Sequence, residues 1–120
     1  ENLYEKRVDP DAMLECLQAD TIDMELVEQV MDKEGVQLNY RDQTFGWTPL
    51  LCAANKGLVE VLALLLAAKV KPVLCNNGNS AVHFAARGGH VKAVHFLISK
   101  KFDLDVRNSN GWTPLMWAAE

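Results

Sequence analysis

The sequence repeats itself with a period of 32 to 33 residues, and this feature constrains the fold more than any other. Residues 46–54 align with residues 78–86 at a shift of 32, and with residues 111–119 at a further shift of 33. A second block, 57–66, is matched in the same register by residues 89–98. A fixed period in this range predicts a stacked array of one structural unit, in which each unit buries its apolar surface against its neighbours.

Each repeated unit starts with residues that suit the beginning of a helix. Thr48, Ser80 and Thr113 carry hydroxyl groups that can accept hydrogen bonds from the free N–H groups of a first helical turn. Pro49 and Pro114 follow directly, at the first helical position, where the missing N–H of proline is harmless. We therefore expect a short helix to begin at each of these sites.

The residues that follow predict a second helix in each unit. Each unit carries a pair of alanines, at 53 and 54, at 85 and 86, and at 118 and 119. These small residues allow neighbouring helices to approach closely, and Gly57 and Gly89 suit the turn that ends the first helix. Second helices are expected over residues 58–68 and 90–100, and they are apolar on most faces, as helices packed between neighbours are.

Together these residues resemble the ankyrin repeat, whose family pattern runs Gly-x-Thr-Pro-Leu-His, Ala-Ala, Gly-His, a Val-x-x-Leu-Leu stretch and Gly-Ala-Asp-Val-Asn. The resemblance covers residues 12–120 and is strongest over 42–119. It implies an all-α solenoid of stacked antiparallel helix pairs joined by β-hairpin-like loops. We expect a single domain over 1–120, made of a divergent capping repeat (9–39), two repeats (40–74 and 75–106) and the first half of a truncated repeat (107–120).

The two ends of the array have their own features. Asp9 and Pro10 suit a helix start, and acidic side chains fit the polar outer surface that a terminal repeat requires. Apolar residues recur there at helical spacing, at Met13, Leu14, Leu17, Met24, Leu26, Val27, Val30 and Met31. The sequence stops at Glu120, inside the first helix of a unit, which we interpret as a fragment of a longer ankyrin domain. The alternative is that another copy or a partner covers this end.

Departures from the family pattern are also informative. His83 alone keeps the histidine of Thr-Pro-Leu-His, because Leu51 and Met116 replace it, so the hydrogen bonds implied for this histidine are missing in two repeats. Lys69 and Lys101 stand where the pattern has glycine after the second helix. The hairpin before the glycine at 46 is one residue longer than the pattern and the next is one shorter, so hairpin shape should vary.

Charge and cysteine content exclude several classes of protein. The net charge of −4 combines −8 over residues 1–40 with +4 over residues 41–120, and the scattered lysines of the basic part do not predict nucleic-acid binding. The longest apolar run, 59–68, is half the length of a bilayer crossing, so we expect no membrane insertion. Three widely spaced cysteines suggest neither a disulfide framework nor a zinc site, which favours an intracellular protein, cytoplasmic or nuclear.

We expect no catalytic residue, no cofactor and no metal, and therefore no enzyme. His83 and His90 occupy positions where the family has structural histidines, and His95 lies at a usually polar position of the second helix. Cys52 and Cys75 suit small core positions better than reactive ones.

The resemblance implies that a partner protein or peptide binds the concave face formed by hairpin tips and first helices. The residues expected to contact it are Phe45, Trp47, Asn55, Lys56, Asn79, Arg87, Asn110 and Trp112. Large aromatic residues and arginine dominate interface energies, although each ring could instead fold onto its own or the next hairpin. Lys56 and Arg87 could pair with an acidic or backbone-carbonyl segment, or end their helices in solvent. Replacing Trp47 and Trp112 by alanine should weaken the partner and leave the fold intact.

The sequence thus predicts a protein–protein interaction module of an adaptor. The alternative is a regulatory or substrate-recruiting ankyrin domain fused to an enzyme or channel, such as a palmitoyl transferase, to which residues 110–119 and the preceding Asp103 and Asp105 are similar. Self-association through the uncovered C-terminal end is a further expectation for its partners.

Overall fold

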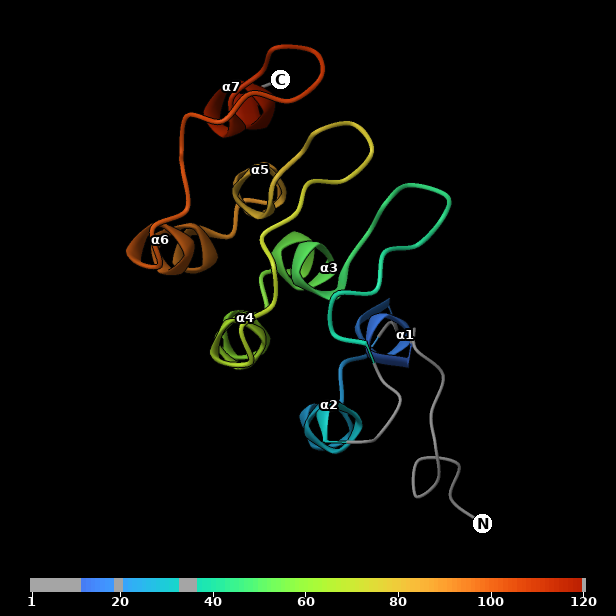
Figure 1. Ribbon diagram of the computed structural model, residues 1–120. Coiled ribbons are helices and arrows are strands. Elements are labelled where there is room, and N and C mark those ends of the chain that lie inside the picture. The colour runs from blue at the N-terminus through green and yellow to red at the C-terminus, as the bar shows by residue number, and fades with distance from the viewer. Residues whose placement is uncertain (1–11, 19–20, 33–36, 120) are drawn as a thin grey trace.

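The computed structural model describes residues 12–18, 21–32 and 37–119, and this part of the chain forms helices and no strands (Figure 1). The helices are α1 (Ala12–Gln18), α2 (Met24–Met31), α3 (Pro49–Lys56), α4 (Val59–Ala67), α5 (Ala81–Arg87), α6 (Val91–Ser99) and α7 (Pro114–Ala119). The all-α architecture predicted from the repeat is confirmed.

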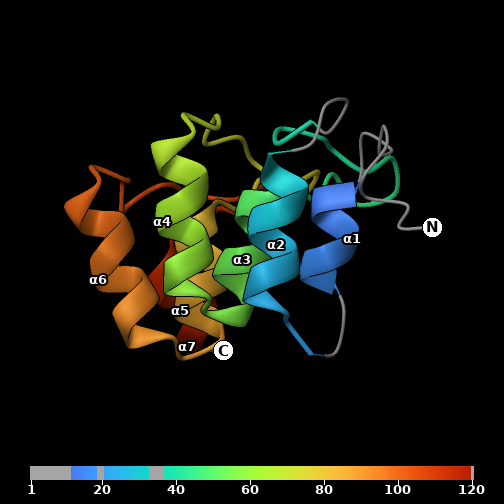
Figure 2. The same ribbon diagram turned by 90° about the horizontal axis from the view of Figure 1, so that it is seen from below.

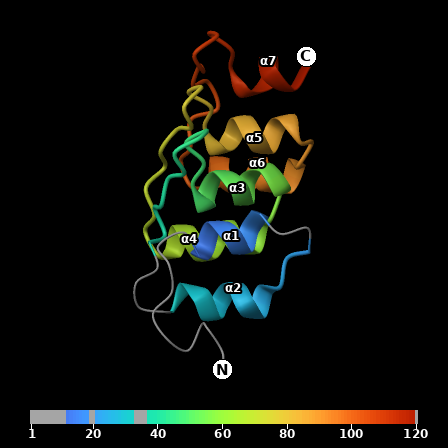
Figure 3. The same ribbon diagram turned by 90° about the vertical axis from the view of Figure 1, so that its right-hand side faces the viewer.

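The helices form two layers. The first helices α1, α3, α5 and α7 follow one another in one layer, and the second helices α2, α4 and α6 form the other (Figures 1 and 2). Extended loops connect each second helix to the next first helix and project together on one side of the stack (Figure 3). The result is an elongated body with principal extents of 48, 27 and 25 Å.

Helices α3, α5 and α7 begin where the sequence predicts. The side-chain oxygens of Thr48, Ser80 and Thr113 each accept a hydrogen bond of 3.3 Å from the backbone N–H three residues later. Pro49 and Pro114 are the first residues of α3 and α7. These three sites are therefore equivalent helix starts, as the period requires. The start predicted at Asp9 and Pro10 lies outside the described residues.

The turns after the helices use left-handed backbone conformations. Gly57 ends α3 with a φ of 70°, and a Cβ there would lie 2.5 Å from the ring of His90, so glycine is required for two reasons. Lys69 and Lys101 follow α4 and α6 with φ of 63° and 73°. These lysines replace the glycine of the family pattern without changing the turn, and an L-residue is strained in that conformation.

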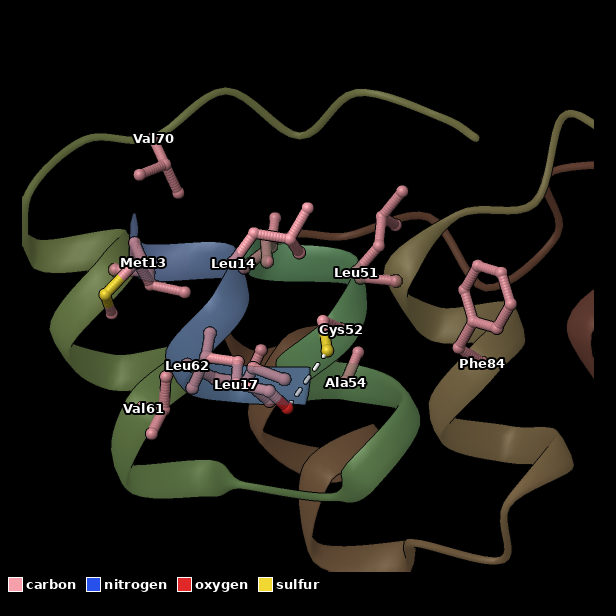
Figure 4. Close-up of a cluster of buried hydrophobic side chains, with 14 of the residues drawn as sticks. Met13, Leu14, Leu17, Leu51, Cys52, Ala54, Val61, Leu62, Val70 and Phe84 are labelled. Carbon is pink, nitrogen blue, oxygen red and sulfur yellow. Dashed lines mark hydrogen bonds between the residues drawn. The ribbon is translucent and has the colours of Figure 1, made fainter. Parts of the chain in front are cut away.

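The core runs continuously from one repeat to the next. Of the apolar residues predicted for the N-terminal helices, Met13, Leu14, Leu17, Val27 and Val30 are buried there, whereas Met24, Leu26 and Met31 are only partly buried. Figure 4 shows buried side chains of α1, α3 and α4 gathered in one cluster, with the Cys52 thiol donating to the Leu17 carbonyl oxygen at 3.3 Å. Because this burial extends across helix pairs, no pair has a closed core of its own.

Candidate functional site

Three hairpin turns lie side by side at the projecting edge of the stack. Each is closed by a backbone hydrogen bond of 2.9 to 3.0 Å between its first and last residues, which are Asp42 and Trp47, Cys75 and Asn79, and Asn108 and Trp112. The first turn contains one residue more than the other two, which are equal in length. We use the term hairpin face for the surface formed by residues 42–47, 75–79 and 108–112 together with the exposed residues of α3, α5 and α7.

The first residue of a hairpin shapes its turn. The Asp42 carboxylate oxygen accepts hydrogen bonds from the N–H groups of Thr44, Phe45 and Gly46 at 2.8 to 3.1 Å. Asn108 has the same role in the third turn, where its Oδ1 accepts from two N–H groups at 3.0 Å. Cys75 lies at the equivalent position of the second turn and is buried as an apolar residue. The repeat register aligns Cys75 with Asn108, but the extra residue of the first turn places Asp42 one position earlier, so the sequence contained only part of the signal for their common position.

Neighbouring hairpins are hydrogen-bonded to each other. The N–H of Asn76 donates to the carbonyl oxygen of Phe45, and the N–H of Ser109 donates to that of Asn77, both at 2.9 Å. Arg41 adds a bridge, because its guanidinium donates to the Leu74 carbonyl at 2.6 Å and to the Asn76 side chain at 3.1 Å. These bonds place the tips in one surface. Nothing in the sequence marks Arg41, since its partners lie in the next repeat.

The structure does not support Asn79 as a contact residue. Its side chain is only 5% exposed, and its Oδ1 accepts a hydrogen bond of 2.8 Å from Nδ2 of Asn108 in the next hairpin. A buried amide needs such a partner, and this one holds the second and third hairpins together. The position was expected to face a partner because the family resemblance places it at a hairpin tip of the concave face, but its short amide reaches the neighbouring hairpin instead.

Aromatic rings form a row across three repeats, which we call the aromatic row: Trp47, Phe84 and Trp117. The ring centroids of Trp47 and Phe84 are 4.5 Å apart, and those of Phe84 and Trp117 are 5.4 Å apart. Phe84 is 7% exposed, whereas the two tryptophans are half-buried. Trp47 therefore packs on the next repeat, so its replacement by alanine would also remove a fold contact, contrary to the expectation of an intact fold.

Phe45 is the aromatic side chain of the hairpin face that is freest to meet a partner. It is 60% exposed, and its recorded bonds involve only its backbone. Trp112 is half-buried, and its backbone carbonyl accepts hydrogen bonds from His83 and from Asn108. The large ring of Trp112 is thus anchored through its backbone, whereas that of Phe45 projects from the tip of the first hairpin.

The polar residues predicted for the site lie at the ends of first helices and at the third hairpin. Asn55 is exposed, and its carbonyl oxygen accepts from Nε2 of His90 at 2.9 Å. Lys56 is half-buried at the last position of α3. Arg87 is exposed at the end of α5, with its guanidinium carbon 4.7 Å from the ring centroid of Trp117. Asn110 is exposed at the tip of the third hairpin.

His83 connects α5 to the third hairpin from a fully buried position. Its Nδ1 accepts from the Ser80 backbone N–H at 3.1 Å, and its Nε2 lies 2.8 Å from the Trp112 carbonyl oxygen. The neutral ring with its proton on Nε2 satisfies both partners, because the carbonyl needs a donor and the amide needs an acceptor. Burial lowers the pKa of His83, and the bond to Trp112 opposes this shift only in part.

The described residues hold no cluster of metal-ligating side chains. Cys52 and Cys75 are buried, and burial raises the pKa of the Cys52 thiol to about 11, which leaves it protonated and unreactive at neutral pH. A search of the described helices finds none that is long and apolar enough to cross a bilayer. On the described residues, the hairpin face offers rings, amides and cations to a partner.

An apolar groove of about 300 Å³ lies against α5, α6 and α7 and shares exposed residues of α7 with the hairpin face. Its walls include Ala86, Val94 and two strongly exposed residues, Val91 at 64% and Leu115 at 73%. A groove of this kind is suited to an apolar partner surface.

The repeated helix pairs define a class of stacked, helical repeat domains. The sequence matches the family described as ankyrin repeats in three copies, over residues 13–108 and again over 68–120. The chain belongs to the ankyrin-repeat family, whose members are generally protein-interaction modules.

Curated relatives share this domain within much longer proteins. The chain is 37% identical to human Ankyrin repeat and KH domain-containing protein 1 over 75% of this chain and 4% of that protein. It is 32% identical to Ankyrin repeat, SAM and basic leucine zipper domain-containing protein 1 of Loxodonta africana, over 82% and 22%. It is 29% identical to Palmitoyltransferase AKR1 of Lachancea kluyveri, over 80% and 14%. The chain thus spans less than a quarter of each of these relatives.

Proposed function

We propose that this domain is a protein-interaction module of an intracellular adaptor, cytoplasmic or nuclear, which binds a peptide or folded partner on the hairpin face. The observation that carries the proposal is the exposure of Phe45 at 60% on a hairpin whose backbone is tied to the next hairpin. A large ring on a fixed backbone loses little freedom when it is buried by a partner, so its contact energy is retained as affinity. The family match supports this general role.

The other residues of the proposed contact surface surround Phe45. Asn55, Lys56, Arg87 and Asn110 offer polar groups, and the half-buried rings of Trp47 and Trp112 offer apolar edges. This combination of aromatic anchors with a polar surround is typical of interfaces with a few dominant residues.

Affinity capture with matched variants tests the proposal. Phe45→Ser removes the exposed ring, and Ile98→Ser removes an apolar side chain, 39% exposed, from α6 at a position outside the lining of the apolar groove. The partner captured by the wild type should bind Phe45→Ser about tenfold more weakly in a titration, because truncating an interface aromatic costs roughly 1 to 2 kcal/mol or more. It should bind Ile98→Ser as tightly as the wild type. Equal loss in both variants would contradict the hairpin face as the binding surface.

A second candidate is a regulatory or substrate-recruiting domain fused to an enzyme or channel. The similarity to Palmitoyltransferase AKR1 favours it, since that relative combines a matching region with an enzyme name. Sequencing the complete coding region tests it, because a catalytic or membrane-spanning domain joined to these repeats would support fusion and a chain without either would contradict it.

Self-association is proposed for the apolar groove against α6 and α7. Leu115 is 73% exposed beside it, so Leu115→Ser should abolish any concentration-dependent dimer seen by light scattering. A dimer that persists in this variant would argue against the groove, and a wild type that stays monomeric at high concentration would end the proposal.

A further inference from the structure

The charges of the hairpin face restrict the chemical class of partner that it can bind. This inference rests on the function proposed above. Helices α3, α5 and α7 contain no acidic residue, and they end with Lys56 and Arg87 on two of their repeats. The three hairpin turns contain a single carboxylate, that of Asp42. That carboxylate is already bonded to three backbone N–H groups. The hairpin face is therefore cationic although the whole chain has a net charge of −4.

The other acidic residues of the described chain belong to different elements. They are Glu15 on α1, Asp23, Glu25, Glu28 and Asp32 on or beside α2, Glu60 on α4, and Asp103 and Asp105 in the segment after α6. An approaching partner thus experiences a positive electrostatic potential at the hairpin face. This potential attracts an acidic partner before contact, and charge pairing stabilises the partner after contact.

Arg87 is held in a position that suits carboxylate recognition. Its guanidinium stacks over the half-buried ring of Trp117, with 4.7 Å between the guanidinium carbon and the ring centroid. One nitrogen reaches the Trp117 carbonyl oxygen at 3.4 Å, a long bond that leaves the outer edge of the planar group exposed. A guanidinium held by an aromatic ring loses less freedom on binding, and its remaining N–H groups match the two oxygens of a carboxylate.

The aromatic row extends from this cation toward the first hairpin. Phe84 links Trp117 to Trp47 through ring contacts of 5.4 and 4.5 Å, so apolar surface adjoins Arg87 on the side away from the C-terminus. A ligand cation such as a methylated lysine would find the Trp117 ring occupied by Arg87 and would be repelled by it. A nucleic acid would find too few cations on this face to neutralise its phosphates.

We propose that the hairpin face binds an extended acidic peptide. A glutamate or aspartate of the peptide pairs with Arg87, and an apolar side chain two or three residues away lies on the aromatic row. Lys56 adds a weaker attraction one repeat earlier. The specificity of the site thus comes from a carboxylate placed next to an apolar residue.

Selection from a displayed library of random twelve-residue peptides tests this proposal. Enriched sequences should carry Asp or Glu within three residues of Leu, Ile, Phe or Trp. The best sequence is then synthesised with a fluorescent label, together with a version in which each acidic residue is replaced by its amide. We expect the amide version to bind about tenfold more weakly by fluorescence anisotropy, and the affinity of the acidic version to fall as salt increases.

Variants of the protein complete the test. Arg87→Gln should weaken the acidic peptide about tenfold, and Arg87→Lys should recover only part of the affinity because lysine lacks the planar pair of donors. Lys92→Gln removes one positive charge from α6, outside the hairpin face, and should leave binding unchanged. Equal thermal midpoints for the variants would show that the fold is retained.

The outcomes separate the two proposals. Enrichment of neutral or basic peptides whose binding requires Phe45 but not Arg87 would contradict the proposed preference for acidic peptides. It would still agree with the proposal that the hairpin face binds a partner. Equal binding of an oligothymidine of similar charge would also overturn it, because any polyanion would then suffice. Failure of the library to yield any peptide sensitive to Phe45→Ser or Arg87→Gln would count against binding on the hairpin face itself.

Discussion

Neighbouring first helices meet in chemically different ways at the two ends of the stack. Between α1 and α3 the core contacts are apolar, since Met13, Leu17 and Leu51 have no exposed surface, and the thiol of Cys52 donates to the Leu17 carbonyl oxygen (Figure 4). Between α5 and the elements after it, His83 takes the place of Leu51 and bonds to the Trp112 carbonyl. The same arrangement of neighbouring repeats is thus stabilised by apolar burial at one junction and by directed hydrogen bonds at the other.

The difference shows what each kind of contact can do. Apolar burial is strong but has no direction, so it keeps helices together without fixing the position of a hairpin. The bonds from His83 to Trp112 and from Asn108 to Asn79 act on the third hairpin itself and fix it against α5 and the second hairpin. Directed bonds therefore concentrate beside the surface proposed for binding, and they add a dependence on pH that the apolar junction lacks.

The largest effect is expected in the apolar junction. Leu51→Ala removes a side chain with no exposed surface and should lower the free energy of unfolding by about 3 kcal/mol in urea denaturation, because it loses both transfer energy and packing. Leu115→Ala makes the same change on α7 at 73% exposure and should cost less than about 0.5 kcal/mol. Similar losses in the two variants would mean that the two junctions do not differ in burial.

His83→Leu would make the third repeat resemble the second at this position. It should still destabilise the fold by about 2 kcal/mol, because the buried Ser80 N–H loses its acceptor and the Trp112 carbonyl loses a donor. His95→Leu, on an exposed position of α6, should change stability by less than about 0.5 kcal/mol in the same denaturation experiment. A stabilising effect of His83→Leu would show that apolar burial alone suffices at both junctions.

As the pH decreases, the free energy of unfolding should fall more steeply in the wild type than in His83→Gln. The pKa of His83 is lowered in the folded state, so the unfolded chain binds the proton more readily. The neutral ring therefore contributes its full stabilisation above the unfolded pKa of about 6.5. This stabilisation is lost as pH falls below that value, because a protonated Nδ1 cannot accept from Ser80. The loss should be smaller than that from His83→Leu, since the bond to Trp112 survives protonation.

Denaturation of both proteins at pH 7 and pH 5 measures this difference, and His95→Gln, at an exposed position of α6, serves as a control substitution. Identical pH dependence in the wild type and His83→Gln would show that the buried ring does not titrate in this range.

The smallest effect on stability is expected at a feature that two successive repeats share, the left-handed lysine after the second helix. Lys69→Gly and Lys101→Gly should each stabilise by about 0.5 kcal/mol, because relief of left-handed strain exceeds the entropy cost of glycine. Lys100→Gly is the matched control, since Lys100 has a φ of −94° and gains nothing from glycine. Thermal midpoints that fall in all three variants would show that these lysines carry no strain.

The period and the residues at helix starts could be interpreted from the sequence because they act locally. Thr48 and Pro49 specify the start of α3 through a hydroxyl, a fixed φ and neighbouring backbone groups. The same is true of the glycine at 57, whose left-handed turn depends on the absence of a side chain. Repetition then implied that the helix pairs stack, since each pair alone leaves apolar surface uncovered.

The details of the candidate site depended on contacts between repeats, which no local signal contains. The sequence identified Phe45 and Arg87 as surface residues, but the stacking of Trp47 on Phe84 and of Arg87 on Trp117 required the spacing between successive first helices. Asn79 shows the limit most clearly, because its place at a hairpin tip suggested a contact residue, whereas its amide is buried against the next hairpin.

The sequence by itself determined the repeating unit, the helix starts and the identity of the side chains carried by the hairpin face. Only the tertiary structure decided which of those side chains remain available to a partner. The physical reason is that helix starts and turns are set by bonds within a few residues, whereas exposure is set by atoms about 30 residues away, whose positions follow from how the repeats pack.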